Sequence, residues 1–220
     1  MTEITIIGGH GKVGLQLSRL LAAQGDTVNA VIRKEEQRQD VQDTGANPVV
    51  ADVQDMDVAA LTELLSGQDA VVWSAGAGGG SPERTYAVDR DAAIRSMDAA
   101  EAAGVKHYVM VSYMGAGQDH GVPEDNDFHA YAQSKADADD HLRASSLTWT
   151  ILGPGMLTDD AATGAIALGR AGEGESNTTA RGNVALVAAR VLADPRGTAK
   201  KFIEFADGDT PVAEAVDSLD

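Results

Sequence analysis

The feature that most constrains this chain is a glycine-rich turn close to its N-terminus. An apolar run over residues 4–7 predicts a buried parallel strand, and Gly8, Gly11 and Gly14 follow it in the spacing G-x-x-G-x-x-G. The first glycine allows a sharp turn, the second allows close approach of a diphosphate, and the third lets the next helix pack on the sheet. That helix is predicted by the apolar pattern over residues 13–21. Its unpaired first-turn N–H groups would hold phosphate, so we interpret the turn as a dinucleotide site rather than a bare structural turn.

Composition limits the possible partners. The 220 residues suit a single domain (1–220) and include no cysteine, which excludes disulfides and thiolate chemistry. The net charge of −17 disfavours nucleic acid and anionic membranes. The first residues are not basic and no apolar run approaches about 20 residues, so we expect a cytoplasmic protein without signal peptide or membrane span. An anionic cofactor must then be held by local cations and helix ends.

The end of the second predicted strand, residues 27–32, bears on the choice of cofactor. In dinucleotide-binding folds an acidic residue at this place hydrogen-bonds the ribose 2′-hydroxyl and selects NAD. Here Arg33 occupies it, and a guanidinium can bind a 2′-phosphate with two hydrogen bonds. The position therefore favours NADP, with NAD and a simple solvated corner as the alternatives.

Further candidate contacts follow the next strands. Asp52 and Val53 come directly after a strand over residues 47–51 and could meet the adenine, although a strand-end aspartate can also cap a helix. Ala75 and Gly76 follow a strand over residues 70–73, where small residues let a ribose and nicotinamide lie against the backbone. The glycines at positions 78–80 suggest a mobile rim, or only a flexible solvent loop.

Strands and helices alternate through the rest of the chain. We expect a helix over residues 86–103, strands over 107–111 and 148–152, a helix over 184–192, a strand over 201–205 and a helix over 212–219. This alternation predicts an α/β fold with a doubly wound parallel sheet, whose ligands bind beyond the carboxyl ends of the strands. Residues 156–180 show little periodicity, and we expect them, with the C-terminal part, to form a small irregular lobe on the substrate side.

One constellation points to catalysis. Tyr131 and Lys135 stand four residues apart on a predicted helix, so both project from one face. An ammonium near a phenol would lower the phenol's pKa and make Tyr131 a usable general acid for carbonyl reduction. Ser112, at the end of a neighbouring strand, could hold the substrate carbonyl. The Y-x-x-x-K spacing also arises by chance on helices.

Other polar residues are interpreted as structural or solvent-exposed. Asp137, Asp139 and Asp140 are expected to form a solvated helix face. The five histidines show no metal-ligand spacing, so no metal site is expected.

The motifs resemble the short-chain dehydrogenase/reductase superfamily, and more narrowly its atypical NAD(P)H-binding, epimerase/dehydratase-like branch. The matching segments are residues 8–14, 51–53, 88–89, 104–112, 131–135, 147–155 and 208–211, in order along nearly the whole chain. The resemblance implies a Rossmann-type sheet with NADP across its carboxyl edge. It assigns the pyrophosphate to the loop formed by Gly8, His10, Gly11, Lys12, Val13 and Gly14.

The resemblance also implies that Arg33 contacts the 2′-phosphate, that Asp52 and Val53 contact the adenine, and that Ala75, Gly76 and Pro154 flank the nicotinamide half, with Lys135 reaching its ribose. Two positions depart from the family pattern. Gly153 replaces a usual arginine, and Tyr113 replaces a common serine and is a reserve candidate for the acid.

The leading hypothesis is an NADP-dependent oxidoreductase that reduces a small carbonyl or a quinone- or flavin-like acceptor, with Tyr131, Lys135 and Ser112 as its catalytic set. A non-catalytic NADP-binding redox sensor is the alternative, because members of this branch include regulators. A sugar-nucleotide epimerase or dehydratase is disfavoured, because the short C-terminal part leaves little room for a nucleotide sugar. The chain is expected to act on a small molecule as a monomer or homodimer.

Overall fold

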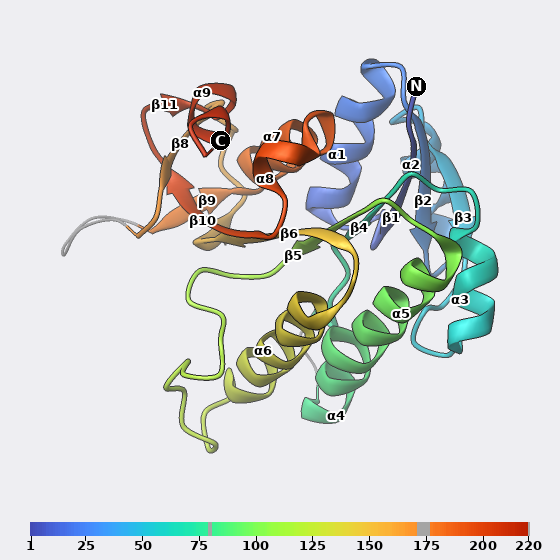
Figure 1. The fold of residues 1–220 in the computed structure, drawn as a ribbon, viewed down its shortest axis with the longest axis horizontal. Helices are drawn as coiled ribbons and strands as arrows, with labels where there is room; N and C mark the ends of the chain where they lie inside the picture. Colours follow the sequence, from blue (N-terminus) through green and yellow to red (C-terminus); the bar gives the residue numbers. More distant parts are fainter. Residues whose placement is uncertain (79–80, 171–176, 220) are drawn as a thin grey trace.

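The computed structural model describes residues 1–78, 81–170 and 177–219, and it is built around one sheet (Figure 1). Along this sheet the strand order is β11-β8-β10-β6-β5-β4-β1-β2-β3. The strands from β3 across to β10 pair in parallel, while β8 pairs antiparallel with both β10 and β11. The predicted doubly wound α/β sheet is confirmed. The parallel strands are β1 (Glu3–Ile7), β2 (Thr27–Ile32), β3 (Asn47–Val50), β4 (Ala70–Trp73), β5 (His107–Val111), β6 (Thr148–Pro154) and β10 (Lys201–Asp207).

Helices cover both faces of the sheet, and each face has its own apolar core (Figure 1). On one face α1 (Lys12–Ala23) packs against α7 (Arg181–Ala193), with α9 (Val212–Asp217) beside them. On the other face α3 (Val58–Leu65) packs against α5 (Ala93–Ala103), which contacts α6 (His129–Ala144). Shorter helical segments include η1 (Glu35–Gln37), α2 (Arg38–Gln42), α4 (Pro82–Thr85) and α8 (Pro195–Thr198). Among the described helices, none combines the length and apolar character needed to cross a bilayer.

The helix predicted over residues 86–103 is longer and less regular than expected. It begins with α4 and passes through a π-helical stretch, η2 (Tyr86–Ala92), before continuing as α5. Its C-terminal end is the predicted one, because Gly104 adopts a left-handed conformation with φ of 74°. A π-helical turn inside an α-helix commonly marks a functional site, because it re-aims the side chains on it.

The C-terminal lobe is more regular than the sequence predicted. Residues 156–180 contain β7 (Met156–Thr158), β8 (Ala165–Leu168) and β9 (Thr178–Ala180), and β11 (Thr210–Pro211) completes the edge of the sheet. Strand β6 runs to Pro154 rather than Leu152, because Gly153 and Pro154 still pair with β10. Of the predicted glycine rim, Gly79 and Gly80 lie outside the described residues.

Candidate functional site

The glycine turn lies at the topological switch point, where the strand order of the sheet reverses. From β1 the chain continues to β2 and β3 on one side, and it later returns to β4 on the other, so a crevice opens beyond the carboxyl ends of β1 and β4. Gly8 has φ of +91°, and a Cβ there would lie 2.6 Å from the backbone nitrogen of Ala75. A Cβ on Gly14 would lie 2.5 Å from the carbonyl oxygen of Gly8. Both glycines are therefore required by close backbone contacts, one to the segment that follows β4 and one to the turn itself.

The N-terminus of helix α1 is open to an anion. Its N-cap is Gly11, and no side chain caps it or places an acid in its first turn. The helix dipole and the first-turn N–H groups are thus directed at the crevice without a competing carboxylate on the same turn. This cradle of glycines with an uncapped helix end fits a dinucleotide diphosphate.

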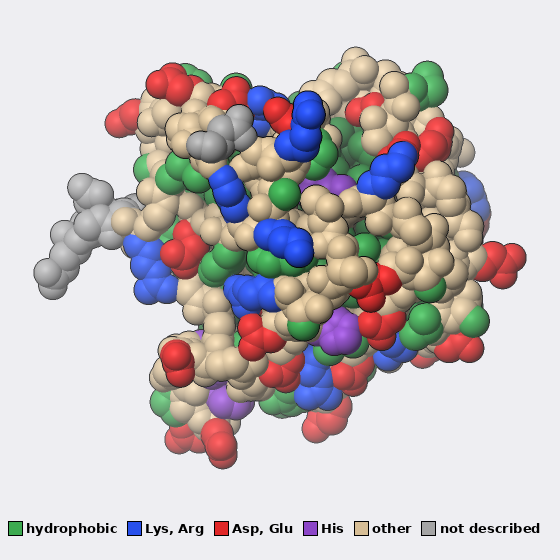
Figure 2. All heavy atoms as spheres, in the orientation of Figure 1, with side chains coloured by type: hydrophobic (Ala, Val, Ile, Leu, Met, Phe, Trp, Pro, Cys, Tyr) green, Lys and Arg blue, Asp and Glu red, His purple; other side chains and the backbone are tan. Residues whose placement is uncertain are grey.

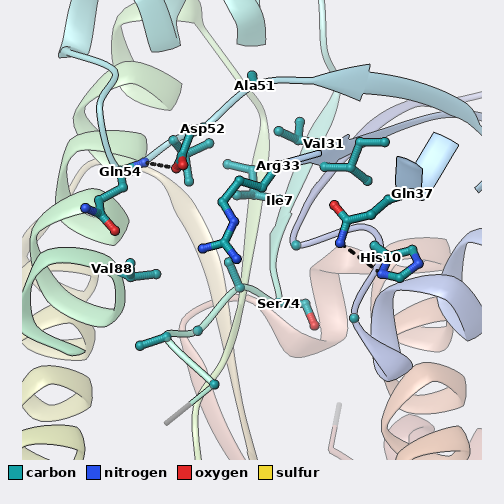
Figure 3. Close-up of a pocket in the computed structure, with 18 of the residues that line it drawn as sticks. Ile7, His10, Val31, Arg33, Gln37, Ala51, Asp52, Gln54, Ser74 and Val88 are labelled. Carbon is teal, nitrogen blue, oxygen red and sulfur yellow. Dashed lines mark hydrogen bonds between the residues drawn. The ribbon is translucent and has the colours of Figure 1, made fainter. Parts of the chain in front are cut away.

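Two cavities join along the carboxyl edge of the sheet. The first has a volume of about 520 Å³ and is shown in Figure 3. Of the predicted cofactor residues it brings together Gly8, His10, Gly11, Arg33, Asp52, Val53, Ala75 and Gly76. The second has a volume of about 1190 Å³ and contains the predicted residues Gly11, Lys12, Val13, Ala75, Gly76, Ser112, Tyr131 and Lys135. Gly11 and residues 74–78 line both cavities, so the two form one continuous cleft.

Two predicted cofactor residues lie outside both linings. Gly14 packs beneath the turn and acts through helix packing, as its place in the motif suggested. Pro154 is buried in β6, where its carbonyl accepts a hydrogen bond from the Met114 N–H at 2.8 Å. The contact of Pro154 with the nicotinamide half stays a prediction.

In the first cavity, Arg33 extends from the end of β2 over the apolar floor formed by Ile7, Val31 and Val88 (Figure 3). Within the described chain its guanidinium has no hydrogen-bond or ion-pair partner. Asp52 is partly engaged, since its carboxylate accepts the Gln54 N–H at 3.1 Å.

The other side chains around the diphosphate turn are already paired. The imidazole of His10 contacts the Asp40 carboxylate at 2.7 Å and the Gln37 amide at 3.1 Å. The ammonium of Lys12 donates to Asp159 at 2.5 Å, and Arg181, which the sequence did not identify, donates to the same carboxylate at 2.8 Å. Both cations line the second cavity, so Asp159 holds two positive charges at its edge.

The lysine and tyrosine of the Y-x-x-x-K motif line the second cavity, but their electrostatics differ from expectation. Lys135 is buried, and its ammonium donates to the Val111 carbonyl at 2.7 Å and contacts the Met110 sulfur at 3.3 Å. Burial lowers the pKa of Lys135, against the attraction of Asp139 and Asp89. The pKa of Tyr131 is raised, by burial first and then by the negative charges of these aspartates. The expected lowering of the Tyr131 pKa is therefore wrong.

Two buried aspartates explain this reversal. Asp89, on the π-helical turn η2, lines the second cavity, and its carboxylate accepts the Ala77 N–H at 2.9 Å. Asp139 is fully buried on α6, contrary to the expected solvated face, and accepts the Ser112 hydroxyl at 2.6 Å. Burial raises the pKa of both carboxyl groups, and Lys135 opposes the shift. Ser112 thus donates its proton inward rather than to a substrate carbonyl.

A cluster of three aromatic rings borders the second cavity. The rings of Tyr113, Phe128 and Tyr131 lie between 5.2 and 5.6 Å apart, centre to centre. Tyr113, the reserve acid, lies outside the described linings, and its hydroxyl has no hydrogen-bond partner in the described structure. The loop that carries Phe128 also adds residues 124–127 to the lining of this cavity.

Comparison with known proteins identifies the family. A model described as NAD(P)H-binding matches residues 8–195. The chain belongs to this NAD(P)H-binding family. Its relative YhfK of Bacillus subtilis (strain 168), called an uncharacterized sugar epimerase, is 33% identical over 222 residues, 99% of this chain and 100% of the relative.

Two solved structures share the whole fold. A Bacillus halodurans protein, provisionally described as an NAD-dependent epimerase/dehydratase, superposes with a TM-score of 0.89 at 31% identity, covering 99% of this chain and 100% of its own. The oxidoreductase ylbE of Lactococcus lactis gives 0.84 at 29% identity, covering 99% and 96%. Membership of the family supports a nicotinamide cofactor in the cleft, and the glycine cradle fits its diphosphate.

Proposed function

We propose that this protein is an NADP-dependent oxidoreductase that reduces a small carbonyl or a quinone- or flavin-like acceptor in the second cavity. One observation carries the proposal: Tyr131 and Lys135 line the second cavity. This cavity is continuous with the first one, which contains the diphosphate turn. When bound, the nicotinamide supplies a hydride. The chain's own residues must then place the acceptor and provide a proton.

Tyr131 is suited to provide that proton. The phenol is protonated at neutral pH, so the hydroxyl is a hydrogen-bond donor when an acceptor oxygen approaches. The raised pKa makes it a weaker acid, so it gives up the proton only as negative charge develops on that oxygen. Lys135 ties α6 to the end of β5 through the Val111 carbonyl, which fixes the helix that carries the phenol. The aromatic cluster with Phe128 excludes water from one side of the ring and offers a surface for a planar acceptor.

NADP rather than NAD is favoured by Arg33. The guanidinium stands at the end of β2, where the ribose 2′ position is expected, and it is unpaired within the described chain (Figure 3). No acidic residue occupies that strand end, since Lys34 follows directly.

The test is an NADPH-oxidation screen against quinones, vicinal diketones and free flavins, repeated with Tyr131→Phe. We expect the substitution to lower kcat for the best acceptor by about 100-fold or more, the usual contribution of a positioned general acid. Tyr113→Phe is the matched control, because it removes a neighbouring phenol from the same aromatic cluster but outside the lining. Unchanged turnover by Tyr131→Phe would leave a reductase that needs only its cofactor and pocket.

The names of two relatives favour a second candidate, an epimerase acting on a sugar derivative. Such an enzyme regenerates its cofactor within each cycle. Interconversion of nucleotide sugars without net NADPH consumption would therefore support this candidate and exclude the reductase. If neither activity is found in a protein that binds NADPH, the redox-sensor alternative gains support.

A further inference from the structure

Asp139 is a buried carboxylate that the Y-x-x-x-K motif does not include. It is 0% exposed, one oxygen accepts the Ser112 hydroxyl at 2.6 Å, and the other has no hydrogen-bond partner among the described residues. Burying a carboxylate that is only partly satisfied costs free energy, so its presence calls for an explanation.

Its place on the helix links it to the reaction centre. Tyr131, Lys135 and Asp139 follow one another at four-residue intervals on α6, so they form one stripe facing the end of β5. Lys135 bonds the Val111 carbonyl and Asp139 bonds the next side chain, Ser112. The helix therefore bonds two consecutive residues, the last one of β5 and the one that follows it. Ser112 lines the second cavity, whereas Asp139 lies outside that lining and its hydrogen bond reaches the cavity through Ser112.

The direction of the Ser112 hydrogen bond determines what the serine can bind. A serine hydroxyl has one proton to donate and lone pairs that accept. Because the proton points to Asp139, the oxygen offers lone pairs toward the cavity. The sequence suggested that Ser112 would donate to a substrate carbonyl, and the observed geometry reverses that role. The carbonyl is then left to the Tyr131 hydroxyl.

Resting on the function proposed above, we infer that Asp139 is a positioning residue that fixes Ser112 as a hydrogen-bond acceptor, so that the preferred substrate carries a hydroxyl or N–H donor next to the carbonyl that is reduced. In the reaction a hydride adds to the carbonyl carbon and the Tyr131 proton adds to its oxygen. The phenolate regains a proton from solvent, and the neighbouring hydroxyl stays bonded to Ser112. α-Hydroxy ketones and enolised diketones belong to this class.

The test compares benzoin with deoxybenzoin, which has the same skeleton without the hydroxyl. We expect the wild-type protein to favour benzoin in kcat/KM by about 10-fold, since one hydrogen bond contributes on the order of 1 kcal/mol. Asp139→Asn keeps the shape but can donate an amide N–H to Ser112, which frees the serine proton for the cavity. In this variant the kcat/KM for benzoin should exceed that for deoxybenzoin by no more than about twofold. The change should arise mainly from a higher KM for benzoin.

Ser112→Ala should lose the same preference, and the double variant should be no worse than the weaker single variant. The NADPH Kd should stay within about twofold in all three, because none of these changes alters the diphosphate turn. A second readout needs no turnover: a slowly exchanging hydroxyl proton resonance in the cofactor-free protein should be lost in both single variants.

The outcomes separate the two proposals. Three results would overturn the role of Asp139 and leave the proposed reductase activity standing. They are turnover of acceptors without a preference for benzoin, additive effects in the double variant, and absence of the hydroxyl resonance. If the wild-type protein binds NADPH and reduces no acceptor at all, the proposed function fails, and the inference fails with it.

Discussion

Replacing Arg33 with alanine should remove the preference for NADPH over NADH. The guanidinium has no partner to lose within the described chain, so the change costs the apoprotein little. A hydrogen bond to a charged group contributes about 1.5–3 kcal/mol. Arg33 is exposed, and solvent screening puts the effect near the lower end, at about 1.5 kcal/mol. That corresponds to a rise of about 10-fold in the NADPH Kd.

The assay is titration of each cofactor by isothermal calorimetry or nicotinamide fluorescence at two salt concentrations. NADH affinity should be almost unchanged in Arg33→Ala, because NADH has no 2′-phosphate. The wild-type preference for NADPH should shrink as salt rises, and the variant should lose this salt dependence. Lys34→Ala is the matched control, since that neighbouring ammonium pairs with Glu36 at 3.3 Å and lies outside the first cavity's lining.

Two results would refute the reasoning. If Arg33→Ala weakened NADPH and NADH equally, the guanidinium would serve the shared part of the cofactor rather than the 2′-phosphate. If the wild-type protein preferred NADH, the assignment of NADP would be wrong from the start.

Three further predictions concern the glycine turn, the cation pair and a buried histidine. Gly14→Ala would place a Cβ 2.5 Å from the Gly8 carbonyl oxygen, so we expect a lower Tm and NADPH binding that is at least about 10-fold weaker. The control Gly117→Ala has open space around the new Cβ and should change neither the Tm nor NADPH binding. Asp159→Asn would release Lys12 and Arg181 toward the cleft, and calorimetry should show NADPH binding tightened by about two- to fivefold, an effect that high salt abolishes; weaker binding would contradict this. Burial lowers the pKa of His107 from 6.5 to about 4, so the unfolded chain binds a proton that the folded chain does not as the pH falls through this window. The unfolding free energy should therefore drop by about 3 kcal/mol more in the wild type than in His107→Gln over that range, and parallel pH profiles would exclude the effect.

Local patterns predicted the central sheet well, because its strands are short apolar runs bounded by turn residues. Strands β4 and β5 have the bounds that the sequence predicted, and Gly104 ends α5 as a left-handed cap. Strands β7, β8 and β9 were missed, since each has only three or four residues and depends on pairing with distant segments. Pairing between remote segments leaves no periodic signal in so short a stretch.

The site shows the same limit. The spacing of Tyr131 and Lys135 placed both on one face of α6, but it could not show that Asp139 on the same stripe is buried against Ser112. An aspartate in a polar helix is usually solvated, so only the tertiary contact with β5 reveals its role. The π-helical turn that buries Asp89 in the cavity lining was equally invisible, although the residue stands in a segment that matched the family.

The distribution of charge over the surface also bears on cofactor binding. The chain carries a net charge of −17, yet Lys and Arg side chains gather toward the middle of the face seen in Figure 2, with many acidic side chains near its rim. Of the cations lining the cleft, Lys12 and Arg181 share the single negative charge of Asp159, and Arg84 bonds the Ala77 carbonyl at 2.8 Å. Within the described structure this leaves Arg33 as the unpaired guanidinium of the first cavity. We therefore expect a dinucleotide that approaches so acidic a protein to be held first by the α1 N-terminus and Arg33. The loss of one exposed side chain should then be enough to change the cofactor preference.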